Sequence, residues 1–91
     1  MATIEVTRQH RLGLEGARRA VLFVVEHLQR DLNARCEWQG ERLNFKCPGA
    51  EGHIELTETL IQLSVDLSWL LKPARGRIER SINDYLDQAL A

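Results

Sequence analysis

The chain has 91 residues, of which 44% are hydrophobic and 27% charged, and its 12 Lys and Arg face 13 Asp and Glu. This length suits one domain with a single thin core, and this composition excludes a disordered chain. The resulting net charge of -1 offers nucleic acid little electrostatic attraction, so we expect no DNA or RNA partner.

The start of the chain gives no indication of export. Residues 1–6 include the acidic Glu5 and lack the basic stretch and apolar run of a signal peptide. No segment approaches about 18 uncharged apolar residues, the length that a transmembrane helix needs. We therefore expect a cytoplasmic protein without a transmembrane segment.

Two elements are expected before residue 34. Residues 3–7 alternate polar and apolar side chains and are rich in β-branched residues, which is typical of a half-buried strand. Between residues 12 and 33, apolar residues recur at steps of three and four, which predicts a long amphipathic helix. Asn33 is expected to end it, because Asn tolerates the left-handed conformation. The predicted core stripe of this helix consists of Leu14, Ala17, Val21, Val24, Val25, Leu28 and Leu32.

Residues 35–68 change to a period of two, which predicts four strands. Turn residues separate these strands at Gly40, at 48–52 and at 57–59, so consecutive strands should pair antiparallel. The residues between the apolar positions are nearly all polar, so one face of the sheet should be wet. The apolar positions are Cys36 and Trp38, then Leu43, Phe45 and Cys47, then Ile54 and Leu56, then Ile61, Leu63, Val65 and Leu67.

Pro73 marks the start of the last element, because its fixed φ and missing N–H suit the first turn of a helix. We expect that helix over residues 73–90. The predicted order is β-α-β-β-β-β-α, a two-layer α+β domain over 1–91 with both helices on one face of a five-stranded antiparallel sheet. This order is loosely like a shortened helix-grip, START-like fold, and the position of the first strand in the sheet stays open.

No set of residues in the sequence predicts a reaction. Cys36 and Cys47 face the same side of a predicted hairpin but would pair diagonally, at about 7 Å or more, so we expect buried, inert thiols rather than a disulfide. The three His fall on a loop, a helix flank and the wet sheet face, with none of the usual metal-ligand spacings. The pair His53 and Glu55 shares one strand face, which is more often solvated surface than an acid–base site. We expect no catalytic residue, metal or cofactor, and lean against an enzyme.

Two places are candidates for an interaction surface. On the wheel of the first helix, Phe23 falls opposite the core, so we expect it to be exposed, either as a patch for a partner or second copy, or as a lone surface aromatic. Trp69, Leu70 and Leu71 cannot all face one core where strand changes to helix, so at least one should be partly exposed. These three residues have two interpretations. One is a plug that closes the corner of the sheet. The other is an interaction site, either a lip over an apolar groove or a contact to lipid or polymer. Such a site would be rimmed by Arg75, Arg77 and Arg80. For Arg77 and Arg80 the other interpretation is a solvated helix face.

Three stretches carry a resemblance to a known family. They are Ile4-Glu5-Val6-Thr7-Arg8 with His10, Leu12-Gly13-Leu14-Glu15 with Ala17, and Leu71-Lys72-Pro73 with Gly76-Arg77-Ile78-Glu79. With them the whole chain resembles the small polyhydroxyalkanoic acid system proteins, which are associated with the granule region of polyester-storing bacteria. The resemblance implies a cytoplasmic bacterial protein linked to storage polyester, at or near the granule surface. It assigns no functional residue.

Two function hypotheses follow from the candidate surfaces and the resemblance. The first is a non-enzymatic accessory protein of the polyhydroxyalkanoate system that makes apolar contacts to a protein partner or to the granule surface. The alternative is a small ligand-binding domain that takes an acyl-type ligand between the sheet and the C-terminal helix. A homodimer is also expected, because Phe23 and any free sheet edge need covering.

Overall fold

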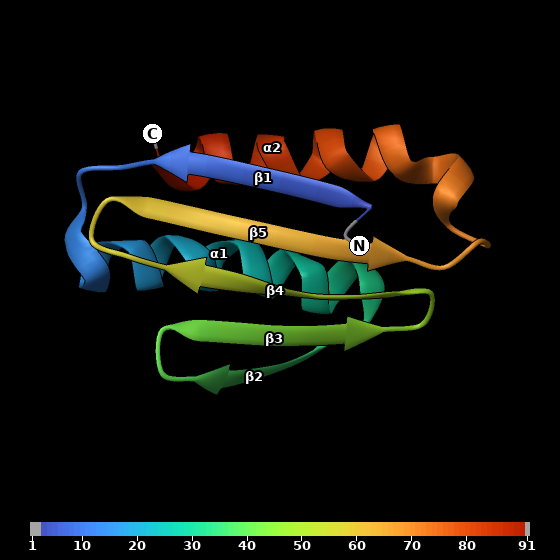
Figure 1. Ribbon diagram of the computed structural model, residues 1–91, viewed down its shortest axis with the longest axis horizontal. Coiled ribbons are helices and arrows are strands. Elements are labelled where there is room, and N and C mark those ends of the chain that lie inside the picture. The colour runs from blue at the N-terminus through green and yellow to red at the C-terminus, as the bar shows by residue number, and fades with distance from the viewer. Residues whose placement is uncertain (1–2, 91) are drawn as a thin grey trace.

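The computed structural model describes residues 3–90, apart from the side chain of Leu32, and confirms the predicted α+β order. Five strands form one antiparallel sheet in the order β1-β5-β4-β3-β2, and both helices cover the same face of it (Figure 1). The elements are β1 (Ile4–Gln9), α1 (Gly13–Leu32), β2 (Arg35–Gln39), β3 (Arg42–Cys47), β4 (Ala50–Leu56), β5 (Leu60–Leu67), a 3₁₀ turn (Lys72–Ala74) and α2 (Arg75–Leu90).

The first strand lies beside the last one. β1 pairs antiparallel with β5 in the register from Ile4 opposite Val65 to Gln9 opposite Leu60. The 20 residues of α1 therefore carry the chain across the covered face from β1 at one edge to β2 at the other. The strands from β2 to β5 then return as a meander, which leaves β1 and β2 as the two edge strands.

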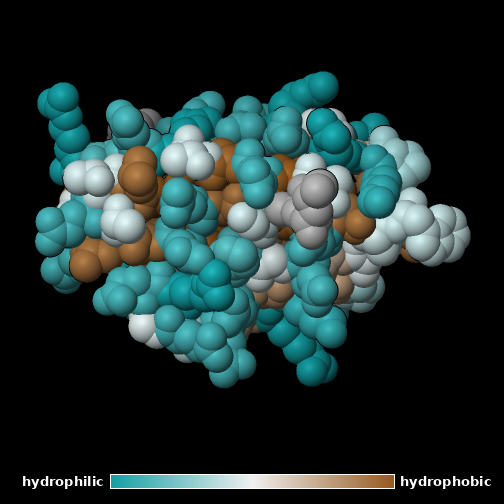
Figure 2. Space-filling view, viewed as in Figure 1, coloured by the Kyte–Doolittle hydropathy of each residue, from teal (hydrophilic) through white to brown (hydrophobic). Residues whose placement is uncertain are grey.

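The core lies between the sheet and the two helices. Alternate strand residues point into it, and α1 fills its centre with Ala17, Val21 and Val24, which are fully buried. The opposite face of the sheet carries mainly hydrophilic side chains, with hydrophobic groups visible between them (Figure 2). This is the wet face that the period of two predicted.

The turn between β3 and β4 is shorter than the predicted segment 48–52. It consists of Pro48 and Gly49, and the φ of +87° at Gly49 suits the third position of a type II turn. Gly52 is instead a strand residue opposite Phe45. A Cβ there would lie 2.0 Å from the backbone oxygen of Ser64 and 3.0 Å from Cζ of Phe45, so only glycine leaves room for the aromatic ring.

The two ends of α1 are closed by different means. At the C-terminal end, Asn33 takes the left-handed conformation (φ 56°, ψ 40°) and its N–H donates to the Gln29 oxygen, as predicted. At the start, Nδ1 of the buried His10 accepts a hydrogen bond from the Leu12 N–H at 3.1 Å. Its Nε2 then carries the proton and donates to the Thr57 oxygen at 3.1 Å. His10 therefore joins the start of α1 to the β4–β5 turn.

Arg8 connects the edge strand β1 to α2. It lies at a core-facing position of β1, opposite Ile61, and its guanidinium is 2.7 Å from the Asp87 carboxylate. It also donates to Oδ1 of Asn83 at 3.0 Å. A charge directed inward at an edge strand also makes that edge a poor partner for another sheet.

Candidate functional site

An apolar cleft of about 230 Å³ lies between the sheet and the facing ends of α1 and α2. All of its lining residues are apolar, and the large ones are Leu28, Phe45, Leu67, Leu71, Ile78 and Ile82. Three alanines, Ala34, Ala50 and Ala74, also line it. Their methyl groups leave volume that larger side chains would fill, which is a local cause of the cleft.

A second hollow, of about 190 Å³, continues the cleft between the two helices. The two cavities share Leu28, Ile78 and Ile82, and the second adds polar groups at its margin, among them Asp31 and Arg77. The combined space therefore passes from a wholly apolar end under the sheet to a partly charged end between α1 and α2.

The corner between β5 and α2 closes the apolar end of this space. Leu71 is half-buried and packs against both the core and the Gly49 backbone, where an added Cβ would meet Leu71 Cδ1 at 2.7 Å. The Ser68 N–H donates to the Gly49 oxygen at 2.8 Å, and the Ser68 oxygen accepts from the N–H groups of Leu71 and Lys72. These bonds hold the corner against the β3–β4 turn.

Trp69 and Leu70, by contrast, point away from the core. Trp69 is 81% exposed and Leu70 is 65% exposed, which agrees with the expectation that at least one residue of this run faces solvent. The two interpretations of the corner therefore apply to different residues. Leu71 is the plug, and Trp69 with Leu70 forms an exposed apolar tip.

Basic side chains follow this tip along the chain. Lys72, Arg75, Arg77 and Arg80 are all exposed, and none forms an ion pair with any residue that the structure describes. The first turn of α2 contains no acidic residue, although that is where acidic residues usually stabilise a helix. Of the three arginines predicted to rim a site, Arg77 also lines the second hollow, whereas Arg75 and Arg80 line neither cavity.

The prediction that Phe23 lies exposed opposite the core is wrong. Phe23 is half-buried against the core, and its ring centroid is 4.5 Å from that of His27, which is 4.6 Å from that of Tyr85 on α2. Its neighbour Ala20 is only 5% exposed. The physical reason is that α2 packs beside α1 and covers the flank that carries Phe23, which widens the buried arc beyond the sheet-facing stripe. The exposed apolar residue of this region is Leu22, at 42%.

Tyr85 links this aromatic stack to the end of α1. Its hydroxyl donates to the Asp31 carboxylate at 2.7 Å, and that hydrogen bond, assisted by burial and the negative charge of Asp31, raises the pKa of Tyr85. Tyr85 also lines the second hollow, whereas Phe23 does not. The structure thus separates Phe23 from the exposed tip at Trp69 and Leu70.

The cysteines do not form a site. Both are free thiols, and both are half-buried rather than buried as predicted, Cys36 because its strand is an edge of the sheet. Burial raises the pKa of each thiol. Among the described residues there is no group of three or more His, Cys, Asp or Glu placed to hold a metal ion.

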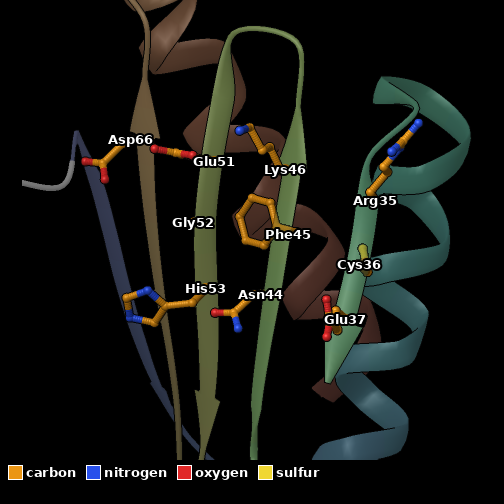
Figure 3. A pocket seen from close by; sticks show the side chains of 10 residues that line it. All are labelled: Arg35, Cys36, Glu37, Asn44, Phe45, Lys46, Glu51, Gly52, His53 and Asp66. Atoms are coloured by element: carbon orange, nitrogen blue, oxygen red, sulfur yellow. The ribbon is translucent and has the colours of Figure 1, made fainter. Parts of the chain in front are cut away.

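A shallow hollow of about 530 Å³ lies on the open face of the sheet (Figure 3). His53 and Asn44 lie side by side on neighbouring strands at one end, while Lys46, Glu51 and Asp66 gather at the other. His53 also approaches the Glu55 carboxylate at 3.5 Å, and Arg42 pairs with the same carboxylate. These groups neutralise one another across a wide, open surface and do not converge on a point where a substrate atom could react.

Comparison with known proteins gives the chain its context. No curated protein matches the chain, and neither does any solved structure. Within the described residues, no helix is long and apolar enough to cross a membrane. A family model described as "Putative polyhydroxyalkanoic acid system protein" matches residues 4–90, a span that includes all three stretches noted in the sequence. The chain belongs to this polyhydroxyalkanoic acid system family.

Proposed function

We propose that this chain is a non-enzymatic accessory protein of the bacterial polyhydroxyalkanoate storage system. In this proposal it acts in the cytoplasm at the granule, through apolar contacts of Trp69 and Leu70 with the granule surface or a protein partner. The observation that carries the proposal is the exposure of these two side chains, 81% and 65%, side by side at one corner. Family membership supplies the link to storage polyester.

The fold does not need these two side chains, which supports a role in contact. Leu71 alone packs into the core at this corner, and backbone hydrogen bonds hold the chain path around Ser68. Burying an exposed Trp or Leu in an apolar surface contributes roughly 1.5–3 kcal/mol for each side chain. Two adjacent exposed apolar residues are therefore a source of binding energy that folding leaves unused.

The test is co-sedimentation of the purified chain with isolated polyester granules. We expect the double variant Trp69→Ser, Leu70→Ser to bind at least tenfold more weakly than the original chain, by the burial energy above. Leu22→Ser is a matched control, because it removes an exposed leucine from α1, away from the corner. Unchanged binding of the double variant, with its circular dichroism intact, would contradict the proposal.

The apolar cleft supports a second candidate function, binding of an acyl-type ligand between the sheet and α2. Its volume of about 230 Å³ exceeds the roughly 150 Å³ of an engineered apolar cavity that binds benzene. It is smaller than the roughly 300–1,000 Å³ of typical pockets for drug-sized ligands, so a short acyl chain fits this candidate better than a long one. Leu71 would contact the bound chain directly.

Thermal unfolding with short hydroxyacyl and fatty-acyl ligands tests this second candidate. A ligand at about 100 times its Kd stabilises the native state by about 2.7 kcal/mol, which is easily measured as a higher Tm. Ala74→Leu fills the cleft and should abolish that shift, while Trp69→Ser, outside the cleft, should preserve it. The absence of any shift in the original chain argues directly against an acyl ligand.

The homodimer remains a prediction of the same kind. Both β1 and β2 are edge strands, but β1 carries the inward charge of Arg8, which makes β2 the better edge for pairing. Sedimentation equilibrium over a range of concentrations measures the oligomeric state. A monomer at every concentration would remove the dimer from the proposal and leave the surface role unaffected.

A further inference from the structure

The exposed tip is followed directly along the chain by exposed basic residues, and together they form a region that we call the basic corner: Trp69, Leu70, Lys72, Arg75, Arg77 and Arg80. The stretch from Lys72 to Arg80 contains four basic residues and one acidic residue, Glu79, in a chain whose net charge is -1. All four basic side chains are exposed. The strongest local excess of positive charge therefore follows the most exposed apolar residues of the molecule.

The shape of this corner argues for a flat partner. The loop between β5 and α2 projects beyond the sheet at one end of the long axis of the molecule (Figure 1). Trp69 and Leu70 are the exposed apolar residues of this projecting loop, and Leu71 next to them lines the apolar cleft. A convex apolar tip with cations around it fits an amphiphile layer, in which the tip enters the apolar region and the cations stay at the charged surface.

The charges near the corner also give the contact an orientation. Glu51 and Asp66 lie opposite each other on β4 and β5, on the open face of the sheet and close to Ser68. With Lys46, which lies opposite Glu51, they leave this side with one net negative charge, whereas the start of α2 carries only basic charges in its first turn. An anionic layer would attract the α2 side of the corner and repel the open sheet face, so only one orientation satisfies both.

We propose that the basic corner docks the protein on an anionic lipid layer, with Trp69 and Leu70 inserted and Lys72, Arg75, Arg77 and Arg80 against the headgroups. Trp prefers the level of the headgroups, because its ring is apolar while its N–H can still donate to water or lipid oxygen. This inference rests on the proposed surface role and specifies its chemistry: the contacted layer is an anionic amphiphile rather than bare polyester or a protein.

The test uses the full chain and vesicles of phosphatidylglycerol mixed equally with phosphatidylcholine, with pure phosphatidylcholine vesicles as the neutral comparison. We expect co-sedimentation with the anionic vesicles only, and weaker binding as salt is added. In a Trp38→Phe background, the fluorescence of Trp69 should shift to shorter wavelength on binding. Equal binding to both kinds of vesicle, or binding to neither, would overturn the proposal.

Charge variants separate docking at this corner from general electrostatic adsorption. Each cation near an anionic surface changes binding by about fivefold, so Arg75→Gln with Arg77→Gln should weaken vesicle binding by about 25-fold. Arg11→Gln with Arg19→Gln is the matched control, since it removes the same charge from exposed positions elsewhere. An equal effect of the two pairs would show that net charge alone matters and would overturn docking at the corner.

A variant with the opposite expected effect guards against misfolding as an explanation. Glu51→Gln with Asp66→Asn removes the repelling charges and should strengthen binding to anionic vesicles several-fold.

The outcomes of the granule and vesicle experiments also separate this inference from the proposed function. If granules still bind the chain but anionic vesicles do not, the surface role stands and lipid docking falls. If vesicles bind it and granules do not, lipid docking stands and the granule role falls.

Discussion

The molecule changes from strand to helix at two places, at opposite ends of the sheet (Figure 1). Between β1 and α1, the buried His10 satisfies a backbone donor and a backbone acceptor with its two ring nitrogens. Between β5 and α2, no side chain caps the turn, and Trp69 and Leu70 are left in solvent. The first junction is arranged for stability, whereas the second leaves apolar surface that the fold does not use.

The largest expected effect on stability is at the first junction. His10→Ala removes two hydrogen bonds and leaves the Leu12 N–H and the Thr57 oxygen without these partners, which should lower the free energy of unfolding by about 2 kcal/mol. Urea unfolding followed by circular dichroism measures it. His53→Ala, on the open sheet face, should cost less than about 0.5 kcal/mol. Equal losses for the two histidines would mean that His10 does not hold the junction.

A smaller effect is expected at the plug of the second junction. Leu71→Ala removes a half-buried side chain that packs on Gly49 and the core, which should cost about 1–1.5 kcal/mol. Leu70→Ala, one residue earlier and 65% exposed, is the control and should leave the urea midpoint nearly unchanged. If Leu70→Ala costs as much as Leu71→Ala, the assignment of plug and exposed tip within this corner is incorrect.

The parts of the fold that the sequence predicted are those that depend on local chemistry. Pro73 lies in the 3₁₀ turn Lys72–Ala74, so α2 itself begins at Arg75, two residues after the predicted start. Asn33 ends α1 as predicted, because it tolerates a positive φ. The pairing of β1 with β5 was left open, since it joins residues about 50 to 60 positions apart and no turn sets it. Phe23 was placed wrongly because a wheel of one helix does not contain the neighbouring helix that covers it.

The candidate site was predictable only in part, for a related reason. The excess of large apolar residues at 69–71 can be read from the sequence, and so can the arginines beside it. The cleft cannot, because it results from three alanines contributed by separate segments, Ala34, Ala50 and Ala74, which meet only after folding. The role of His10 was missed as well, although its position just before the uncapped helix start was the available signal.

A pH dependence is expected at the contact between the helices, next to the second junction. The hydrogen bond to Asp31 raises the pKa of Tyr85 in the folded state above its unfolded value of about 10. The stabilisation is therefore fully present below that value and is lost as pH rises through the folded-state pKa. Because the hydrogen bond between Tyr85 and Asp31 is exposed to solvent, the change should be slight. Its measure is the difference in Tm between the original chain and Tyr85→Phe from pH 8 to pH 11, and a constant difference would contradict it.

The smallest expected effect on stability is that of the double variant Trp69→Ser, Leu70→Ser. Both side chains lie in solvent, and the hydrogen bonds of Ser68 hold the corner without them, so the free energy of unfolding should change by less than about 0.5 kcal/mol. Urea unfolding of this variant and of His10→Ala compares the two junctions directly. A loss as large as that for His10→Ala would mean that Trp69 and Leu70 serve the fold. A negligible loss, together with loss of surface binding, would mean that the second junction keeps these side chains for contact alone.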